Sequence, residues 1–311
     1  MNDYSAFGIR FQSEISLPGL RKRDPGQQPD VAIRFGEVPE TLENVTYRGH
    51  AWMAAPGVLL LNRPEAGRFL VRDGREIVIQ PRHGVSEAVV QVFLQGSAFG
   101  ALLHQRGIFP LHAGVVQVGN DCVAFTGHSG AGKSTFTAAL HQAGYPVISD
   151  DVAAIQCSAN TAPVVFSGRS VVKLNSDSLT AVAGNDHGLA EPQSELEKFE
   201  LPVTSVSERH GISLRAVYEL HPADHSDEEC IVGYPNAKGL MCLSRHTYRR
   251  RYEIGLGMSQ QHFLTRGRIL QSVGVFGFHR VRDLKQLSRH VRRLEQHWQS
   301  LAEPRRTKRA A

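Results

Sequence analysis

The stretch that decides the fold is Gly127-His128-Ser129-Gly130-Ala131-Gly132-Lys133-Ser134, which matches the phosphate-loop pattern G-x-x-x-x-G-K-[ST]. Its glycines permit backbone angles that a Cβ atom would forbid, so successive N–H groups can point at phosphate oxygens. An apolar strand is expected at 122–126 and a helix at 133–142, which is the context that the motif needs. The sequence therefore predicts a site for a nucleoside triphosphate, with ATP and Mg²⁺ as the expected cofactors.

Two side chains of this loop have specific expected roles. Lys133 should reach the β- and γ-phosphates, and Ser134 should ligate Mg²⁺. We expect Lys133 to face solvent when no ligand is bound. Ser129 and Thr135 are weaker members, because each could contact phosphate or equally serve loop geometry or packing. The predicted nucleotide-binding residues are Gly127, Ser129, Gly130, Ala131, Gly132, Lys133, Ser134 and Thr135.

A pair of aspartates, Asp150 and Asp151, ends the next expected strand at 146–149, and Asp150 lies 17 residues after Lys133. If the strands before and after the helix are parallel neighbours in a βαβ unit, both carboxylates lie beside the phosphates. One can orient Mg²⁺ through water and the other can accept a proton from an attacking hydroxyl. The alternative is that one aspartate caps a turn. The division of roles stays open; Ser134 and Asp151 are the predicted metal-site residues.

The first part of the chain is typical of short strands and turns. Strands are expected at 31–35, 57–61, 67–71 and 77–79. Asp73-Gly74 separates the last two, and this dipeptide between β-rich runs indicates a hairpin whose central positions have positive φ. We therefore expect a small antiparallel sheet as an N-terminal domain at 1–82.

The remainder, 83–300, should form the catalytic domain. A helix is expected at 86–105, capped by Ser86, and it is a candidate for the bridge between the two parts. Further expected elements are strands at 113–118 and 215–220 and a helix at 283–298. Residues 180–211 are polar and glycine-rich, which fits a mobile loop over the site or plain surface structure.

Composition places the chain among folded soluble proteins, with 311 residues, 41% hydrophobic and 21% charged. The net charge of +5 and the pI of about 9.1 favour anionic partners without indicating nucleic acid. We interpret the basic end at 301–311 as a solubilising, disordered tail. The basic residues of this region are Arg289, Arg292, Arg293, Arg305, Arg306, Lys308 and Arg309.

The four cysteines, Cys122, Cys157, Cys230 and Cys242, contain no C-x-x-C pair, and we expect no nearby histidine to complete a zinc pattern. Scattered thiols fit a reducing compartment. No secretion signal is visible at the N-terminus, and no apolar run approaches the roughly 18 residues of a membrane span. The expectation is a cytoplasmic protein without a membrane partner.

Three motifs together resemble the catalytic domain of the HPr kinase/phosphorylase family: 111–115, 127–134 and 147–151. That family phosphorylates a serine of a carrier protein, on a fold similar to the nucleotide-binding part of phosphoenolpyruvate carboxykinase. On spacing alone His112 is more typical of an ordinary core or surface histidine. The resemblance implies instead that His112 is a site residue and that Asp150 and Asp151 act in proton transfer and metal placement. It implies an α/β fold, α+β overall, with a carboxykinase-like P-loop core.

Flanking motifs resemble a divergent branch, the HPr-kinase-like proteins of lasso-peptide and other modified-peptide biosynthesis. They are Phe7-Gly8, 13–18, 67–71, Gln105-Arg106-Gly107 and Thr247-Tyr248-Arg249. Members of that branch can phosphorylate a serine at the C-terminus of a precursor peptide. The resemblance adds Arg249 as a candidate catalytic residue, with a solvated residue of the run 249–251 as the alternative.

The chain also departs from the carrier-protein kinases. His128 stands where they usually have an acidic residue, and Thr135 where they usually have glutamate. The glycine-rich segment tied to their phosphorylase activity is not recognisable. The sequence therefore predicts a kinase only, acting on a serine of a peptide or small protein, with a lasso-peptide precursor as one candidate.

Other functions remain as alternatives. The same site would serve a small-molecule hydroxyl kinase or an NTP-hydrolysing regulatory ATPase. A transporter ATPase is disfavoured because no L-S-G-G-Q-like signature follows and the paired aspartate comes too early. The intact Lys133, Ser134 and both aspartates argue against a degenerate scaffold. The oligomeric state, including a homo-oligomer, stays open.

Overall fold

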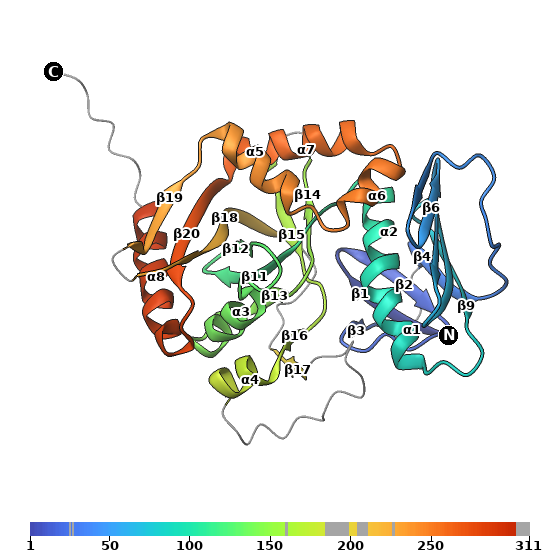
Figure 1. The fold of residues 1–311 in the computed structure, drawn as a ribbon, viewed down its shortest axis with the longest axis horizontal. Helices are drawn as coiled ribbons and strands as arrows, with labels where there is room; N and C mark the ends of the chain where they lie inside the picture. Colours follow the sequence, from blue (N-terminus) through green and yellow to red (C-terminus); the bar gives the residue numbers. More distant parts are fainter. Residues whose placement is uncertain are drawn as a thin grey trace.

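The computed structural model describes residues 1–302 apart from 25, 27, 159–160, 184–198, 204–210 and 226–227. These residues form a mixed α/β fold with two large sheets (Figure 1). The expected basic tail beyond 302 and most of the expected loop at 180–211 lie outside the described residues. No helix in the described part is long and apolar enough to cross a membrane.

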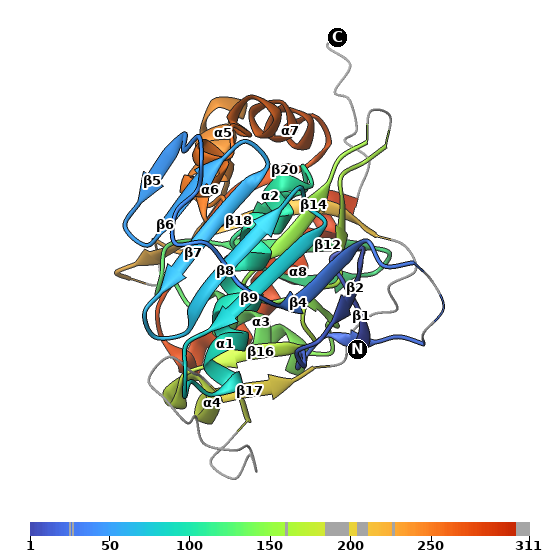
Figure 2. The same cartoon turned by 90° about the vertical axis from the view of Figure 1, so that its right-hand side faces the viewer.

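The N-terminal sheet is larger than expected and is mixed rather than antiparallel (Figure 2). Its nine strands lie in the order β3-β1-β2-β4-β9-β8-β7-β6-β5, and β4 pairs in parallel with both β2 and β9. The four expected strands are present: the one at 31–35 has the expected bounds, and the other three are shifted or extended by one or two residues. The strands are β1 (Asn2–Ala6), β2 (Ile9–Ser13), β3 (Arg21–Lys22), β4 (Val31–Phe35), β5 (Tyr47–Gly49), β6 (Trp52–Ala55), β7 (Val58–Arg63), β8 (Gly67–Arg72) and β9 (Glu76–Pro81).

The predicted hairpin between β8 and β9 is confirmed. Asp73 and Gly74 have φ values of 51° and 63°, as a type I′ turn requires. The N–H of Arg75 donates to the carbonyl of Arg72 at 2.9 Å and closes the turn.

The expected helix at 86–105 is one rod with a π-helical middle, formed by α1 (Glu87–Phe93), η1 (Leu94–Ala98) and α2 (Phe99–Gln105). Ser86 has the extended backbone of a capping residue, but its side chain makes no capping hydrogen bond. The rod packs against the N-terminal sheet, and the shared core includes Ala154, which belongs to a strand of the second sheet, and its neighbour Val152. It therefore bridges the two parts, as expected.

The second sheet carries the phosphate loop. From β12, one side continues through β11 to β13, and the other side continues through β18 to β20 and β19. Strands β10, β14 and β15 extend it at the amino end of β18. The strands are β10 (Phe109–Leu111), β11 (Ala113–Val118), β12 (Asp121–Thr126), β13 (Val147–Ser149), β14 (Ala153–Gln156), β15 (Val164–Phe166), β18 (Ile212–Ala223), β19 (Cys230–Gly233) and β20 (Gly274–Val281).

The expectation that β12 and β13 are parallel neighbours is wrong. Strand β11 lies between them and is antiparallel to both. Because two reversals restore the direction, β13 still runs the same way as β12. The residues that follow the two strands therefore reach the same edge of the sheet, separated by one strand.

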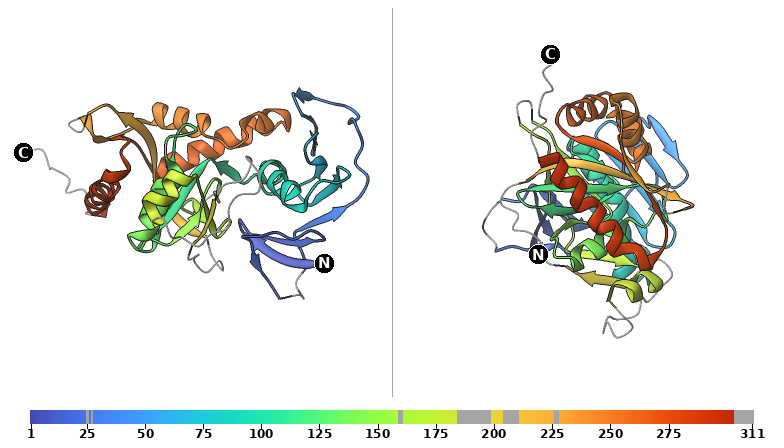
Figure 3. Two further views of the ribbon diagram at one scale, coloured as in Figure 1. Left: turned by 60° about the horizontal axis from the view of Figure 1, so that its bottom comes forward. Right: turned by 90° about the vertical axis from the view of Figure 1, so that its left-hand side faces the viewer.

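Helices cover both faces of this sheet. On one face α3 (Lys133–Gln142) and α8 (Leu287–Ala302) contribute Phe136, Leu140 and Leu294 to the core, with α8 crossing the face diagonally (Figure 3). On the other face lie α5 (Asn236–Arg245) and α7 (Ser259–Ser272). The predicted helix at 283–298 is confirmed except that it begins as a short 3₁₀ turn, η3 (Leu284–Gln286), with Leu284 exposed. The remaining elements are α4 (Ser176–Ala183), α6 (Arg250–Gly255), β16 (Val171–Leu174) and β17 (Phe199–Pro202).

Candidate functional site

The phosphate loop joins β12 directly to α3. Gly127, Gly130 and Gly132 have φ values of 153°, 78° and 86°, a region that side chains with a Cβ rarely adopt. A Cβ on Gly127 would also stand 3.1 Å from the carbonyl oxygen of Leu220. The sequence therefore folds here into the compact turn that places a helix N-terminus at the end of a strand, which suits an anion.

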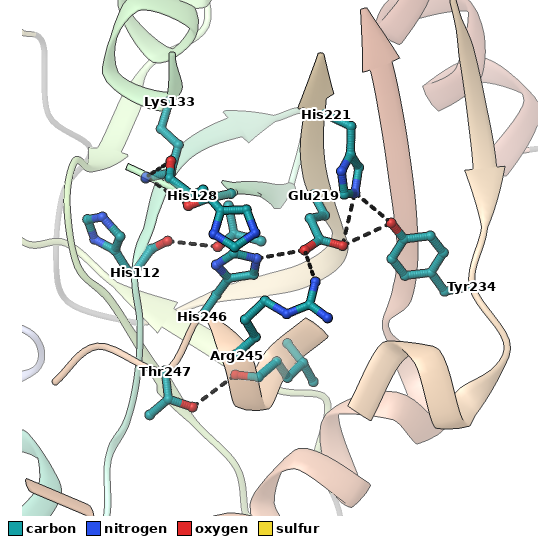
Figure 4. A network of polar contacts seen from close by, with 12 residues as sticks. His112, His128, Lys133, Glu219, His221, Tyr234, Arg245, His246 and Thr247 are labelled. Atoms are coloured by element: carbon teal, nitrogen blue, oxygen red, sulfur yellow. Dashed lines mark hydrogen bonds and ion pairs between the residues drawn. The ribbon is translucent and has the colours of Figure 1, made fainter. Parts of the chain in front are cut away.

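Lys133 is buried, with 8% exposure, so the expectation that it faces solvent is wrong. Its ammonium group donates to the carbonyl oxygens of Gly127 and His128 at 3.0 and 3.2 Å (Figure 4). The loop thus folds its own carbonyls around the cation. These two hydrogen bonds hold the Lys133 ammonium group against the loop when no ligand is bound.

The other predicted loop residues differ in their surroundings. Ser129 and Gly130 are exposed at the tip. The Thr135 hydroxyl lies 2.8 Å from the Ser178 hydroxyl of α4, which favours the packing role for Thr135. Ala131 donates its N–H to the His128 carbonyl at 3.0 Å and so closes the turn.

Asp150 follows β13 and is 8% exposed. Its Oδ2 accepts the backbone N–H of Lys173 at 3.1 Å, whereas Oδ1 is buried without a hydrogen-bond partner. Burial raises the pKa of Asp150 to about 6, against the opposing effects of the Lys173 N–H and the nearby Ser134 hydroxyl. A Cβ on Gly114 would clash with the Thr137 hydroxyl and stand 3.4 Å from Oδ1, so glycine at this position makes room for the Thr137 side chain next to the aspartate.

Asp151 differs from its neighbour in almost every respect. Its side chain is 49% exposed and its backbone is left-handed, with φ 74°. The Nδ1 of His112 lies 3.1 Å from Oδ1 and 2.8 Å from the carbonyl oxygen of the same aspartate. Burial tends to raise the pKa of Asp151, but the bond to His112 and the positive charges of Lys173 and Arg249 lower it overall.

The segment after α5 brings Arg249 to this pair. The N–H of His112 donates to the His246 carbonyl and that of Tyr248 to the Pro110 carbonyl, both at 2.8 Å. Arg249, with φ 50°, holds its guanidinium 5.4 Å from the centre of the Tyr248 ring. The fold therefore gathers His112, Asp151 and Arg249 from distant parts of the chain, and Asp150 adjoins them.

Sequence reasoning missed a second buried carboxylate, Glu219, on the other side of the loop. It stands next to Thr126 in the parallel pairing of β12 and β18 and is 2% exposed. Four side chains surround it: His246 at 2.7 Å, Tyr234 at 2.9 Å, His221 at 3.1 Å and Arg245 at 3.3 Å (Figure 4). The signal in the sequence was a lone acidic residue directly beside Ala216, Val217, Tyr218 and Leu220 in an expected strand.

This network holds the pKa of Glu219 far below its usual range, although burial alone would raise it. The His246 ring also packs edge-on against the His128 ring of the loop, with centroids 5.4 Å apart. Glu219 therefore connects the phosphate loop to the segment that carries Arg249.

The expectation that no histidine completes a zinc pattern is wrong in one respect. Cys242 lies four residues before His246, and ligand atoms of these two and Glu219 lie within 4.8 Å of one another. The carboxylate already accepts several hydrogen bonds, however, and the Arg245 cation adjoins it. Burial, followed by the negative charge of Glu219, raises the pKa of the Cys242 thiol.

No protein-family model and no curated protein matches the chain. Among solved structures it is similar to the Hpr(Ser) kinase/phosphatase from Coxiella burnetii, at 13% identity, over 61% of this chain and 94% of that one. The TM-score of 0.30 is too low for this likeness to bear on fold or activity. The site is therefore interpreted from its own residues.

Proposed function

We propose that this chain is an ATP-dependent kinase that transfers the γ-phosphate to a serine hydroxyl of a peptide or small protein. One observation carries the proposal: a phosphate loop with its lysine in place meets a buried, half-paired Asp150 and an ionised, half-exposed Asp151 at one sheet edge. Nucleotide binding alone would need only the loop. A carboxylate open to solvent beside it suits a hydroxyl that arrives from outside.

The residues present fit Mg²⁺. The Oδ1 of Asp150 is buried without a hydrogen-bond partner, and the Ser134 hydroxyl is close enough to influence the Asp150 pKa. Bound Mg²⁺ would neutralise charge on the phosphates. We therefore propose Ser134 and Asp150 as the residues that would hold the ion, in place of the Ser134 and Asp151 expected from the sequence.

Asp151 is then the proton acceptor. Its lowered pKa keeps the carboxylate ionised at neutral pH, and His112 fixes its orientation through Nδ1. As the acceptor oxygen attacks phosphorus, Asp151 can take its proton, a contribution typically worth roughly 10²–10⁴-fold in rate. Arg249 lies near enough to steady the negative charge of the transferring group.

The peptide acceptor, including a lasso-peptide precursor, comes from the resemblance of sequence motifs. The half-exposed Asp151 and His112 are compatible with a macromolecular hydroxyl at the surface. A small-molecule kinase and a regulatory ATPase are the alternatives.

The test is transfer from [γ-³²P]ATP with Mg²⁺ to matched peptides that carry serine or alanine at one position, including peptides encoded beside this protein. Label on the serine peptide alone supports the proposal, whereas label released only as phosphate supports the ATPase. Lys133→Ala should abolish transfer while retaining the fold, which circular dichroism would show. Full activity in excess EDTA would contradict the metal requirement.

A further inference from the structure

Arg280 touches the phosphate loop from the side opposite to the aspartates. It belongs to β20, which lies two strands from β12, while β13 lies two strands from β12 in the other direction. Its Nη2 donates to the carbonyl of Ala131 at 2.8 Å, and a Cβ on Gly132 would stand 2.8 Å from the same nitrogen. The guanidinium also lies 5.3 Å from the centre of the Phe136 ring in α3. Arg280 thus contacts the end of the loop and the start of its helix.

This guanidinium is a buried cation without a carboxylate of its own. Arg280 is 5% exposed, its Nε has no acceptor, and no residue in the described part of the chain forms an ion pair with it. The nearby Glu229 is already engaged, by His290 at 2.7 Å and by Arg289 and Arg293 at 3.3 Å. Burial, followed by repulsion from Arg282, lowers the pKa of Arg280 to about 10.

The balance of charge at this corner is therefore positive. Burying a cation without a counter-charge is costly, and one bond to a neutral carbonyl offsets only part of that cost. A residue that only braced the loop could do so with a neutral donor. A guanidinium kept beside phosphate-directed N–H groups is instead suited to an anion, because it can offer paired donors to phosphate oxygens.

We propose that Arg280 binds the phosphate chain of the nucleotide, so that Lys133 and Arg280 hold it from two sides of the loop. The proposal rests on the proposed function for the identity of the ligand. It makes Arg280 a positioning residue for the phosphates rather than a participant in proton transfer. It also predicts that the charge of Arg280 disfavours the ligand-free fold and favours the bound one.

Arg280→Met tests this, with calorimetry for ATP and for inorganic tripolyphosphate and urea unfolding of the ligand-free protein. We expect both ligands to bind roughly 10–100-fold more weakly, as for the loss of charge-assisted hydrogen bonds. The unfolding midpoint without ligand should be unchanged or higher. Arg282→Met, two residues on and exposed, is the matched control and should leave both affinities within about twofold of wild type.

Several results would overturn the proposal. One is a ligand-free Arg280→Met protein that is less stable yet binds both ligands as wild type does, which would make Arg280 a structural brace. If Arg280→Met weakens the binding of ATP but not of tripolyphosphate, Arg280 contacts the nucleoside and not the phosphate chain. If Arg280→Met does not fold, Arg280→Gln keeps a donor for Ala131 without the charge, and unchanged tripolyphosphate affinity in that variant would likewise contradict the proposal.

The binding measurements need no turnover, so they separate the two proposals. If the wild-type protein binds ATP but transfers phosphate to no peptide, the kinase proposal is contradicted and the proposal for Arg280 still stands. If the wild-type protein binds neither ATP nor tripolyphosphate, both proposals are contradicted.

Discussion

Asp150 and Glu219 are two buried carboxylates on opposite sides of the phosphate-loop strand, and their surroundings differ sharply. Asp150 has one backbone donor and one unpaired oxygen, and its pKa is raised. Glu219 is surrounded by four donors, and its pKa is lowered. Both stand at the same edge of the same sheet, so position alone does not explain the difference.

This difference in hydrogen bonding distinguishes a carboxylate that stabilises the fold from one that is available to a ligand. A carboxylate whose oxygens are all bonded stabilises the fold and has little left to offer a ligand. A carboxylate left half-paired costs stability until something binds it. The Glu219 side therefore holds the structure together, and the Asp150 side is where substrate and ion are expected.

Asp151→Asn should give the largest effect and tests whether the reactive chemistry lies on the Asp150 side. Asparagine tolerates the left-handed backbone of residue 151 and can still bond His112, so the fold should be retained. Without a proton acceptor, kcat should fall by roughly 10²–10⁴-fold while the Kd for ATP changes little.

The measurement is peptide phosphorylation rate beside ATP affinity by calorimetry. Asp177→Asn, an exposed carboxylate in the first turn of α4, serves as the control. Asp150→Asn and His112→Ala should also lower kcat more than they weaken ATP binding. If all three site variants keep kcat within a few-fold of wild type, the active site has been misplaced.

The second prediction concerns stability, where the two carboxylates should respond with opposite signs. Glu219→Gln removes the charge that His246, Arg245 and their neighbours share, and should cost about 3–5 kcal/mol. Asp150→Asn removes a poorly compensated buried charge, and should leave the free energy of unfolding unchanged or raise it. Urea denaturation without nucleotide or Mg²⁺ measures both, and equal losses in the two variants would remove the distinction drawn here.

Much of the fold could be predicted because its signals are local. The Asp73-Gly74 turn, the loop glycines and the helix that follows them are each set by a few consecutive residues. Strand order is set by packing between distant segments, which explains why the insertion of β11 between β12 and β13 was missed. The parallel pairs of β4 escaped prediction for the same reason.

The site could be predicted as far as its residue types. The loop and the two aspartates were candidates from motif and order, and His112 was a candidate from the family resemblance. The structure brings them to one edge of the sheet. The burial of Lys133 depends on carbonyls that only the folded loop presents. Glu219 and Arg280 acquire their surroundings from partners far along the chain, so the sequence indicated neither their burial nor their contacts.

The third prediction uses pH to isolate the unpaired carboxylate. The pKa of Asp150 is about 6 in the folded protein, above its ordinary value of 3.8. Between pH 4 and 6 the Asp150 carboxyl is ionised in the unfolded chain but still protonated in the folded protein. The free energy of unfolding therefore falls as pH rises, and this contribution of Asp150 is lost in full by about pH 7. The shift corresponds to about 3 kcal/mol.

The observable is the unfolding free energy of Asp150→Asn minus that of wild type, measured from pH 4 to 8. It should grow from near zero to about 3 kcal/mol. Taking the difference cancels other titrations, including the buried His104 and His262, whose lowered pKa values act in the opposite direction. If this difference does not change with pH, the Asp150 carboxylate is not destabilising in the folded protein. The contrast between Asp150 and Glu219 would then be unsupported.

The smallest effect should come from Arg249, at the margin of the reactive side. Arg249→Ala should lower kcat by about tenfold, equivalent to about 1.4 kcal/mol, because the group is exposed and its field is screened by solvent. Arg250→Ala is the matched control, since Arg250 is the exposed neighbour in the same basic run and should change kcat by less than about twofold.

A second readout distinguishes a role at the site from a general loss of surface charge. Arg249 helps to lower the pKa of Asp151, so its removal should raise that pKa. If Asp151 is the proton acceptor, the acidic limb of the kcat–pH profile should then move to higher pH in Arg249→Ala and stay in place in Arg250→Ala. If neither kcat nor the acidic limb of the profile changes in Arg249→Ala, Arg249 is a solvated surface residue. The candidate site would then include His112 and Asp151 but not Arg249.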